Sequence, residues 1–129
     1  MKTLDKKSVI GITALLVHAA KIDENYTESE KKLIVSFIKS YIKDDNLDKL
    51  LQEAENLEQN SNQLLNFTNI IKKENDEVKS DIIRHLWKII ISDKSVDQYE
   101  SNLVRRICGL IYFSDKLSAE IKLQILNDE

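Results

Sequence analysis

Apolar residues recur at intervals of three and four along most of the chain, and this spacing predicts α-helices. In the first predicted helix Ile12, Leu15, Leu16 and Ala19 share one face. The predicted helices cover residues 5–22, 28–43, 47–58, 63–73, 77–91, 98–113 and 118–126. Ser118 is the expected N-cap of the last helix. Seven helices joined by short connections predict an all-α, compact bundle in a single domain, residues 1–129.

Three later helices carry an apolar face that we expect to point into the core. These faces are Leu33, Ile34, Phe37, Ile38 and Tyr41; then Ile82, Ile83, Leu86, Trp87 and Ile90; then Leu103, Val104, Ile107 and Ile111. Cys108 lies beside the last of these faces, so we expect a small core residue rather than a reactive thiol. His18 and His85 are each expected to be a single histidine that is either hydrogen-bonded within the fold or facing solvent.

The sequence matches itself at an offset of 70 residues. The paired residues are Ile12 with Ile82, Leu16 with Leu86, Asp23 with Asp93, Thr27 with Asp97, Glu30 with Glu100 and Leu33 with Leu103. Because the match continues through the acidic loop, we expect a duplicated helix-loop-helix hairpin. Its copies would be residues 5–43 and 77–114, related by an approximate two-fold axis. The helices of residues 46–73 lie between them in sequence, and residues 118–126 form a C-terminal helix.

Composition narrows the class of protein. The 129 residues include 19 Lys and Arg against 22 Asp and Glu, a formal net charge of −3. This balance provides no basic surface for nucleic acid. Two Gly and no Pro leave few turn-forming residues, in agreement with an all-helical chain. The single Cys excludes a disulfide framework or a Cys-based zinc site, and it favours a reducing, cytoplasmic location.

The apolar run at residues 9–17 resembles the centre of a secretory signal, but a core helix explains it better. The run is nine residues long and contains Gly11 and Thr13, and a similar run recurs at residues 82–91. A bilayer span needs roughly 20 apolar residues. We therefore expect no signal peptide and no stable membrane insertion.

Two segments that contain the acidic loops are similar to a known family. "HAAKIDENYTESEKKLI" and "HLWKIIISDKSVDQYESNLVRRI" resemble the TerB-like family, which is named for bacterial tellurite-resistance proteins. The pairs Leu86-Trp87 and Arg105-Arg106 and the closing "LSAEI" resemble its uncharacterised single-domain branch. The resemblance implies an all-helical fold and an acidic surface for which divalent-metal binding is the hypothesis. It implies no particular enzymatic activity.

Each loop ends in a pattern that also has a purely structural explanation. Thr27-x-x-Glu30 and Asp97-x-x-Glu100 both have the spacing of a capping box at a helix start. In such a box the cap side chain accepts a hydrogen bond from the third helical N–H, and the Glu accepts one from the cap's own N–H. The two Glu side chains are thus either helix caps or metal ligands, and both alternatives stay open.

Asp23 and Asp93 are the stronger candidates for metal binding. Each follows the end of a helix, where the unpaired carbonyls disfavour a carboxylate, so either a local Asx turn or a cation should compensate. The loops lack the Gly and the bidentate Glu of an EF-hand. The predicted metal ligands are Asp23, Glu30, Asp93 and Glu100, with Asp97 and Glu28 as further candidates. Oxygen ligands favour Ca²⁺, Mg²⁺ or Mn²⁺, and we expect the first loop to bind better because Lys94 offsets the acids of the second.

The sequence contains no phosphate-binding Gly loop, nucleophile elbow or Ser-His-Asp set, so an enzyme is the least supported class. The leading hypothesis is a non-enzymatic TerB-like module with an acidic, divalent-metal-binding face, acting in stress-associated signalling or scaffolding through a protein partner. A homo-oligomer is compatible with it. The alternative is a purely structural protein-interaction domain whose acidic loops are helix caps without metal.

Overall fold

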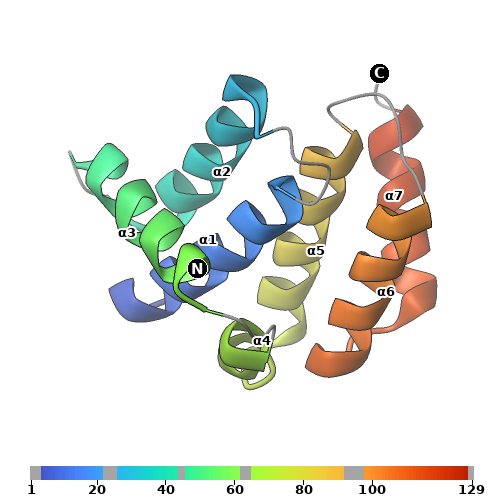
Figure 1. The fold of residues 1–129 in the computed structure, drawn as a ribbon. Helices are drawn as coiled ribbons and strands as arrows, with labels where there is room; N and C mark the ends of the chain where they lie inside the picture. The colour runs from blue at the N-terminus through green and yellow to red at the C-terminus, as the bar shows by residue number, and fades with distance from the viewer. Residues whose placement is uncertain (1–3, 22–25, 44–45, 62–64, 92–97, 128–129) are drawn as a thin grey trace.

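The computed structural model describes residues 4–21, 26–43, 46–61, 65–91 and 98–127, without the side chains of residues 98–101. This part of the chain folds into seven α-helices with no strand, which confirms the all-α prediction (Figure 1). The helices are α1 (Lys6–Ala20), α2 (Glu28–Tyr41), α3 (Leu47–Gln59), α4 (Leu65–Ile71), α5 (Asp76–Ile91), α6 (Gln98–Ile111) and α7 (Asp115–Asn127).

Two helices form the centre of the bundle. α1 packs against α2, α3, α4 and α5, and α5 packs against α1, α2, α6 and α7. In Figure 1 they lie between α2 and α3 on one side and α6 and α7 on the other. Their sequences explain this position, because both have buried residues on nearly every side. Gly11 allows the close approach of α4, since a Cβ atom there would collide with the Ile70 side chain.

The predicted core faces are confirmed. Ile12, Leu15, Leu16 and Ala19 are buried, as are the predicted residues of α5 and α6. On α2 the centre of the face is buried, while Leu33 and Tyr41 at its margins are half-buried. Each fully buried large aliphatic or aromatic side chain contributes about 2 kcal/mol relative to an exposed one. Packing along these faces therefore accounts for most of the favourable free energy of folding.

Short polar side chains begin four of the helices. Each accepts a hydrogen bond from a backbone N–H of the first turn, which otherwise has no partner within the helix. The caps are Asp5 for α1, Thr27 for α2, Asn75 for α5 and Ser114 for α7. The Thr27 cap was predicted from the sequence.

The predicted start of the last helix is wrong. α7 begins at Asp115 rather than Ser118, because Ser114 caps it: the Leu117 N–H donates to Ser114 Oγ at 3.3 Å. Ser118 instead lies one turn inside the helix, buried against α5. There its Oγ accepts a hydrogen bond from Trp87 Nε1 at 3.0 Å. Ser114 and Ser118 are both suitable N-cap residues, so the local sequence does not distinguish them. The packing of Ser118 against Trp87 does.

The predicted end of α6 at residue 113 is also wrong. The helix ends at Ile111, because Tyr112 adopts the left-handed conformation with φ 59°. The Phe113 N–H then donates to the Cys108 carbonyl at 2.8 Å, as in a Schellman motif. This turn reverses the chain into α7.

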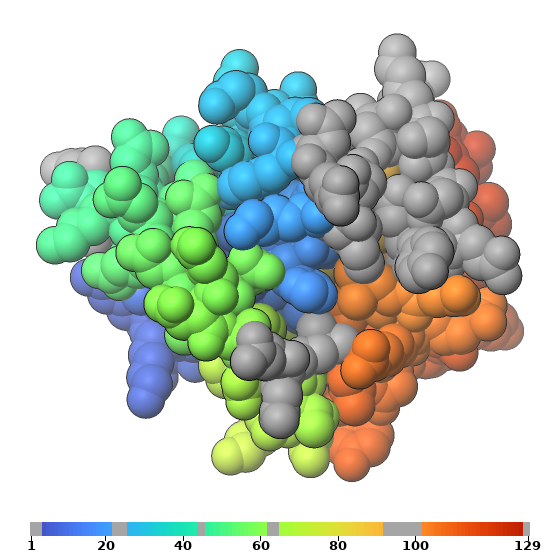
Figure 2. Space-filling view, in the orientation of Figure 1, coloured from blue at the N-terminus to red at the C-terminus, as the bar shows by residue number. Residues whose placement is uncertain are grey.

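Other helix ends differ from the predictions by a few residues. α2 ends at Tyr41 rather than at residue 43, since Ile42 is extended with φ −129° and ψ 130°. α4 (Leu65–Ile71) ends at Ile71 rather than at residue 73, while residues 63 and 64 of the predicted helix lie outside the described residues. It packs beside α6 at one end of the molecule (Figure 2).

α1 contacts α2, and α5 contacts α6, as the two predicted hairpins require, but the loop of the first, residues 22–25, lies outside the described residues. The loop of the second hairpin, residues 92–97, lies outside the described residues. The approximate two-fold relation between the hairpins stays a prediction.

Candidate functional site: the acidic start of α2 and the adjacent groove

The first turn of α2 forms the predicted capping box. The Glu30 N–H donates to Thr27 Oγ1 at 3.2 Å, and Glu30 Oε1 accepts from the Thr27 N–H at 2.7 Å. Thr27 Oγ1 lies 3.0 Å from the same carboxylate oxygen. Glu30 is only 3% exposed. The capping role of Glu30 is therefore confirmed, and it occupies at least one oxygen of the carboxylate.

Tyr26 links this helix start to α3. Its hydroxyl donates to Glu55 Oε2 at 2.7 Å, while Lys31 Nζ lies 4.9 Å from the centroid of its ring. Lys31 also pairs with Glu28 at 3.7 Å. The exposed Glu28 is thus partly neutralised by a neighbour one turn away, and a surface pair of this kind contributes little to stability.

The Tyr26 hydroxyl is partly buried beside the carboxylate of Glu55. Burial, the hydrogen bond to Glu55 and the negative charges of Glu55, Glu30 and Glu28 all raise the pKa of Tyr26 well above its ordinary value. The phenol therefore stays protonated and acts as a donor. The three carboxylates therefore favour the neutral form of the phenol over the phenolate.

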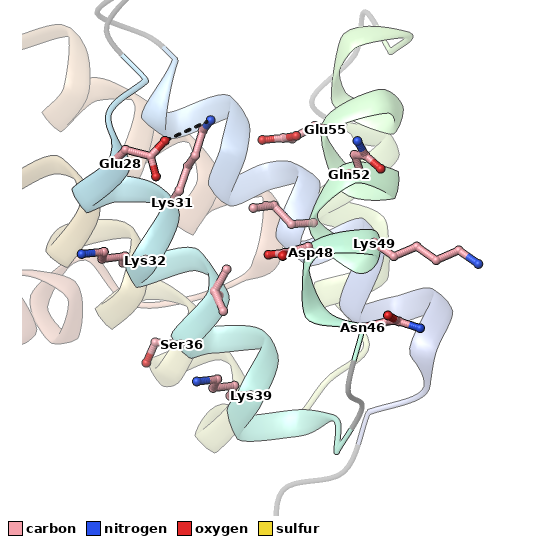
Figure 3. Close-up of a pocket in the computed structure, with 12 residues that line it drawn as sticks. Glu28, Lys31, Lys32, Ser36, Lys39, Asn46, Asp48, Lys49, Gln52 and Glu55 are labelled. Carbon is pink, nitrogen blue, oxygen red and sulfur yellow. Dashed lines mark ion pairs between the residues drawn. The ribbon is translucent and has the colours of Figure 1, made fainter.

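A groove of about 890 Å³ runs between α2 and α3 beside this helix start (Figure 3). Asp48 and Glu55 direct their carboxylates from α3 toward α2, whereas Lys49 points away. On the opposite wall Lys32 and Lys39 point away from α3. Val35 and Leu51 supply apolar lining. The interior of the groove thus presents more negative charge than its composition alone suggests.

A second acid of α3 is tied to α1. Glu58 accepts a hydrogen bond from Lys21 Nζ at 2.9 Å, and its other oxygen lies 3.2 Å from His18 Nδ1. Burial raises the pKa of Glu58, but the hydrogen bonds and charges of Lys21 and His18 outweigh it and lower the pKa below the ordinary value. His18 is thus hydrogen-bonded within the fold, one of the two alternatives expected for it.

The other candidate chemical groups also serve the fold. His85 Nδ1 lies 2.9 Å from the Asp81 carbonyl, and its ring packs edge-on against Phe37 with 5.2 Å between centroids. Cys108 is fully buried, and burial, only partly offset by a hydrogen bond with Ser118, raises its pKa to about 11. A thiol in that state is a poor nucleophile at neutral pH, so the prediction of a core cysteine is confirmed.

The structure describes two of the six predicted metal ligands. Glu28 is exposed at the first residue of α2, and Glu30 is buried in the capping box. Asp23, Asp93 and Asp97, together with the Glu100 side chain, lie outside the described residues. Among the side chains that the structure describes, no group of three or more His, Cys, Asp or Glu is arranged to hold a metal ion. The described acids alone therefore do not make a metal centre.

Glu55 was not among the sequence-predicted residues. Its contact with Tyr26 spans 29 residues of chain and carries no local signal. The groove beside Glu55 was not predicted either, because it exists only where α2 and α3 pack side by side.

Residues 9–123 match the family model described as "Tellurite resistance protein TerB". The chain belongs to the TerB family. The family resemblance inferred from the two acidic segments is therefore confirmed. No curated protein and no solved structure gave a significant match to the chain. None of the helices described in this TerB-family chain combines the length and apolar character needed to cross a bilayer.

Proposed function

We propose that this TerB-family chain is a non-enzymatic cytoplasmic module whose acidic face, at the start of α2, binds a divalent cation weakly and recognises a protein partner. Its role is in signalling or scaffolding. The association with stress rests on the description of the family as a tellurite resistance protein. The cytoplasmic location rests on the single Cys, which is buried and forms no disulfide.

One observation carries the cation part of the proposal. Glu28 and Glu30 lie in the first turn of α2, and Tyr26, three residues after Asp23 in the sequence, donates to Glu55 at 2.7 Å. A cation held by Asp23 would be attracted by these three charges and by the carbonyls at the end of α1. Oxygen ligands select Ca²⁺, Mg²⁺ or Mn²⁺ over zinc or copper. With few side-chain ligands, a dissociation constant on the order of 10⁻⁴ M or weaker is expected.

The capping box supports the alternative function, a protein-interaction domain without metal. Glu30 already accepts hydrogen bonds through Oε1, and Glu28 pairs with Lys31. In this alternative the acids stabilise the start of α2 and shape the groove, and partner recognition takes place there without an ion.

Calorimetric titration with Ca²⁺, Mg²⁺ and Mn²⁺ separates the two functions. We expect a saturable signal for the native chain, the loss of most of it in Asp23→Asn, and a smaller loss in Asp93→Asn. Asp48→Asn is the matched control, because it removes one exposed carboxylate from the α3 wall of the groove and leaves every predicted ligand unchanged. It should leave the affinity nearly unchanged.

Binding should also weaken as the pH falls and the carboxylates are protonated. The absence of a saturable signal at millimolar ion, or a signal that survives Asp23→Asn unchanged, leaves the interaction domain as the function of the chain.

A further inference from the structure

A second, smaller cavity of about 230 Å³ lies where α5, α6 and α7 meet. Its lining includes Trp87 from α5, Val104 and Arg105 from α6, and Asp115, Ser118 and Lys122 from α7. The volume is below the 300–1,000 Å³ typical of small-molecule sites. A cavity of this size accommodates one amino-acid side chain rather than a cofactor.

The apolar part of the cavity is held rigidly. Trp87 is 5% exposed, and its Nε1 donates to the buried Ser118 Oγ at 3.0 Å. Lys122 Nζ lies 4.9 Å from the centroid of the same ring. A hydrogen-bonded indole at the edge of a cavity gives an entering methylene group a preformed surface, so little ordering is needed on binding.

The charges around the cavity are mostly positive. Arg105 and Lys122 contribute two cations, and Asp115 contributes the one carboxylate among the described lining residues. Neither cation makes a salt bridge with any side chain that the structure describes. In a chain whose net charge is −3, this is a local positive site with apolar walls. An arginine fork prefers a carboxylate, which it binds through two parallel hydrogen bonds.

We propose that this pocket, the Trp87 pocket, binds the carboxylate of an Asp or Glu side chain from an acidic segment of a partner protein. Arg105 holds the carboxylate with its fork, Lys122 adds a second positive charge, and the aliphatic part of the side chain lies against Trp87. This assigns a recognition chemistry to the partner of the proposed function. Binding in the Trp87 pocket requires no metal ion, and it is tested with variants of other residues. The failure of one proposal therefore leaves the other standing.

Trp87 is the one Trp in the chain and therefore reports on the pocket directly. The probe is a tetraglutamate peptide with blocked ends, titrated at low salt while Trp emission is recorded. We expect a saturable change in emission that disappears as salt is added, because the attraction is ionic. A tetraglutamine peptide with the same blocked ends should give none.

Arg105→Gln should weaken the binding of the peptide roughly tenfold, the usual effect of losing a hydrogen bond to a charged group. Lys122→Gln should weaken it by a smaller factor. Arg106→Gln is the matched control: it is the next residue, equally exposed, and it does not line the pocket. It should change the affinity by less than about twofold. Circular dichroism checks that each variant is folded.

Three results would overturn the proposal. One is the absence of a saturable change at peptide concentrations of about 10 mM. Another is an equal loss of affinity in Arg105→Gln and Arg106→Gln, which would indicate general electrostatic attraction. The third is that succinate binds as tightly as the peptide, which would make a free dicarboxylate, rather than a partner segment, the occupant.

Discussion

Tyr112 occupies a backbone position that glycine tolerates better. Its φ of 59° lies in the left-handed region, which costs a residue with a Cβ atom about 1–2 kcal/mol. The Tyr112 side chain offsets little of this free-energy cost, because it is 73% exposed and its one described ring contact is Lys72 Nζ at 5.6 Å. An exposed cation–π contact contributes about 0.5 kcal/mol.

The variants Tyr112→Ala and Tyr112→Gly separate the backbone effect from the side-chain effect. Both remove the Lys72 contact, but only Gly relieves the left-handed strain, at the cost of a more flexible unfolded chain. We expect Tyr112→Gly to be more stable than Tyr112→Ala by about 1 kcal/mol. For a chain of this length that difference raises the Tm by about 4 °C.

Urea unfolding followed by circular dichroism measures the difference. Ala119→Gly is the control, because Ala119 is exposed inside α7, where Gly should destabilise by about 1 kcal/mol. Equal stability of the two Tyr112 variants, or a less stable Gly variant, would refute the argument that strain is stored at the end of α6.

Two further predictions concern hydrogen-bonded side chains. Thr27→Ala should lower the free energy of unfolding by about 1 kcal/mol, because the Glu30 N–H loses its cap; thermal or urea unfolding measures this. Glu58→Gln should cost about 1 kcal/mol near neutral pH, since it weakens the contacts with Lys21 and His18. The folded-state pKa of Glu58 is lowered, so the native chain has this stability above the ordinary value of 4.5 and loses it as the pH falls through the folded pKa. The difference between native and Glu58→Gln chains should therefore shrink below that pH.

Each of these has a matched control. Ser36→Ala removes an exposed hydroxyl from the same helix as Thr27 without removing a cap, and it should be nearly neutral. Glu53→Gln changes an exposed acid of the same helix as Glu58, and it should leave the free energy of unfolding at neutral pH nearly unchanged. A pH profile of Glu58→Gln parallel to the native profile would contradict the lowered pKa.

The helices could be predicted from the sequence because their apolar residues follow one local period over many turns. Ile12, Leu16, Ile82 and Leu86 are buried where that period places them. The capping box of Thr27 was equally predictable, since its two partners are three residues apart. Information within one or two turns of helix therefore determined what was predicted correctly.

Contacts between distant parts of the chain could not be predicted in the same way. The Tyr41 hydroxyl donates to Asp81 Oδ2 at 2.7 Å, and Tyr26 reaches Glu55 on another helix. Neither pair has a spacing that distinguishes it from other polar pairs in the chain. The start of α7 was missed for the same reason, because the role of Ser118 depends on Trp87, 31 residues earlier in the chain.

The described acids near the start of α2 each have a structural partner. Glu30 stabilises the start of α2 through Oε1, while Glu28 and Glu55 are held by Lys31 and Tyr26. A carboxylate has two oxygens and about four acceptor positions, so capping and cation binding do not exclude each other chemically. A side chain that is 3% exposed, however, offers an ion very little accessible surface. For this reason the cation hypothesis depends on Asp23 far more than on Glu30, in agreement with the sequence, which had already made Asp23 the stronger candidate.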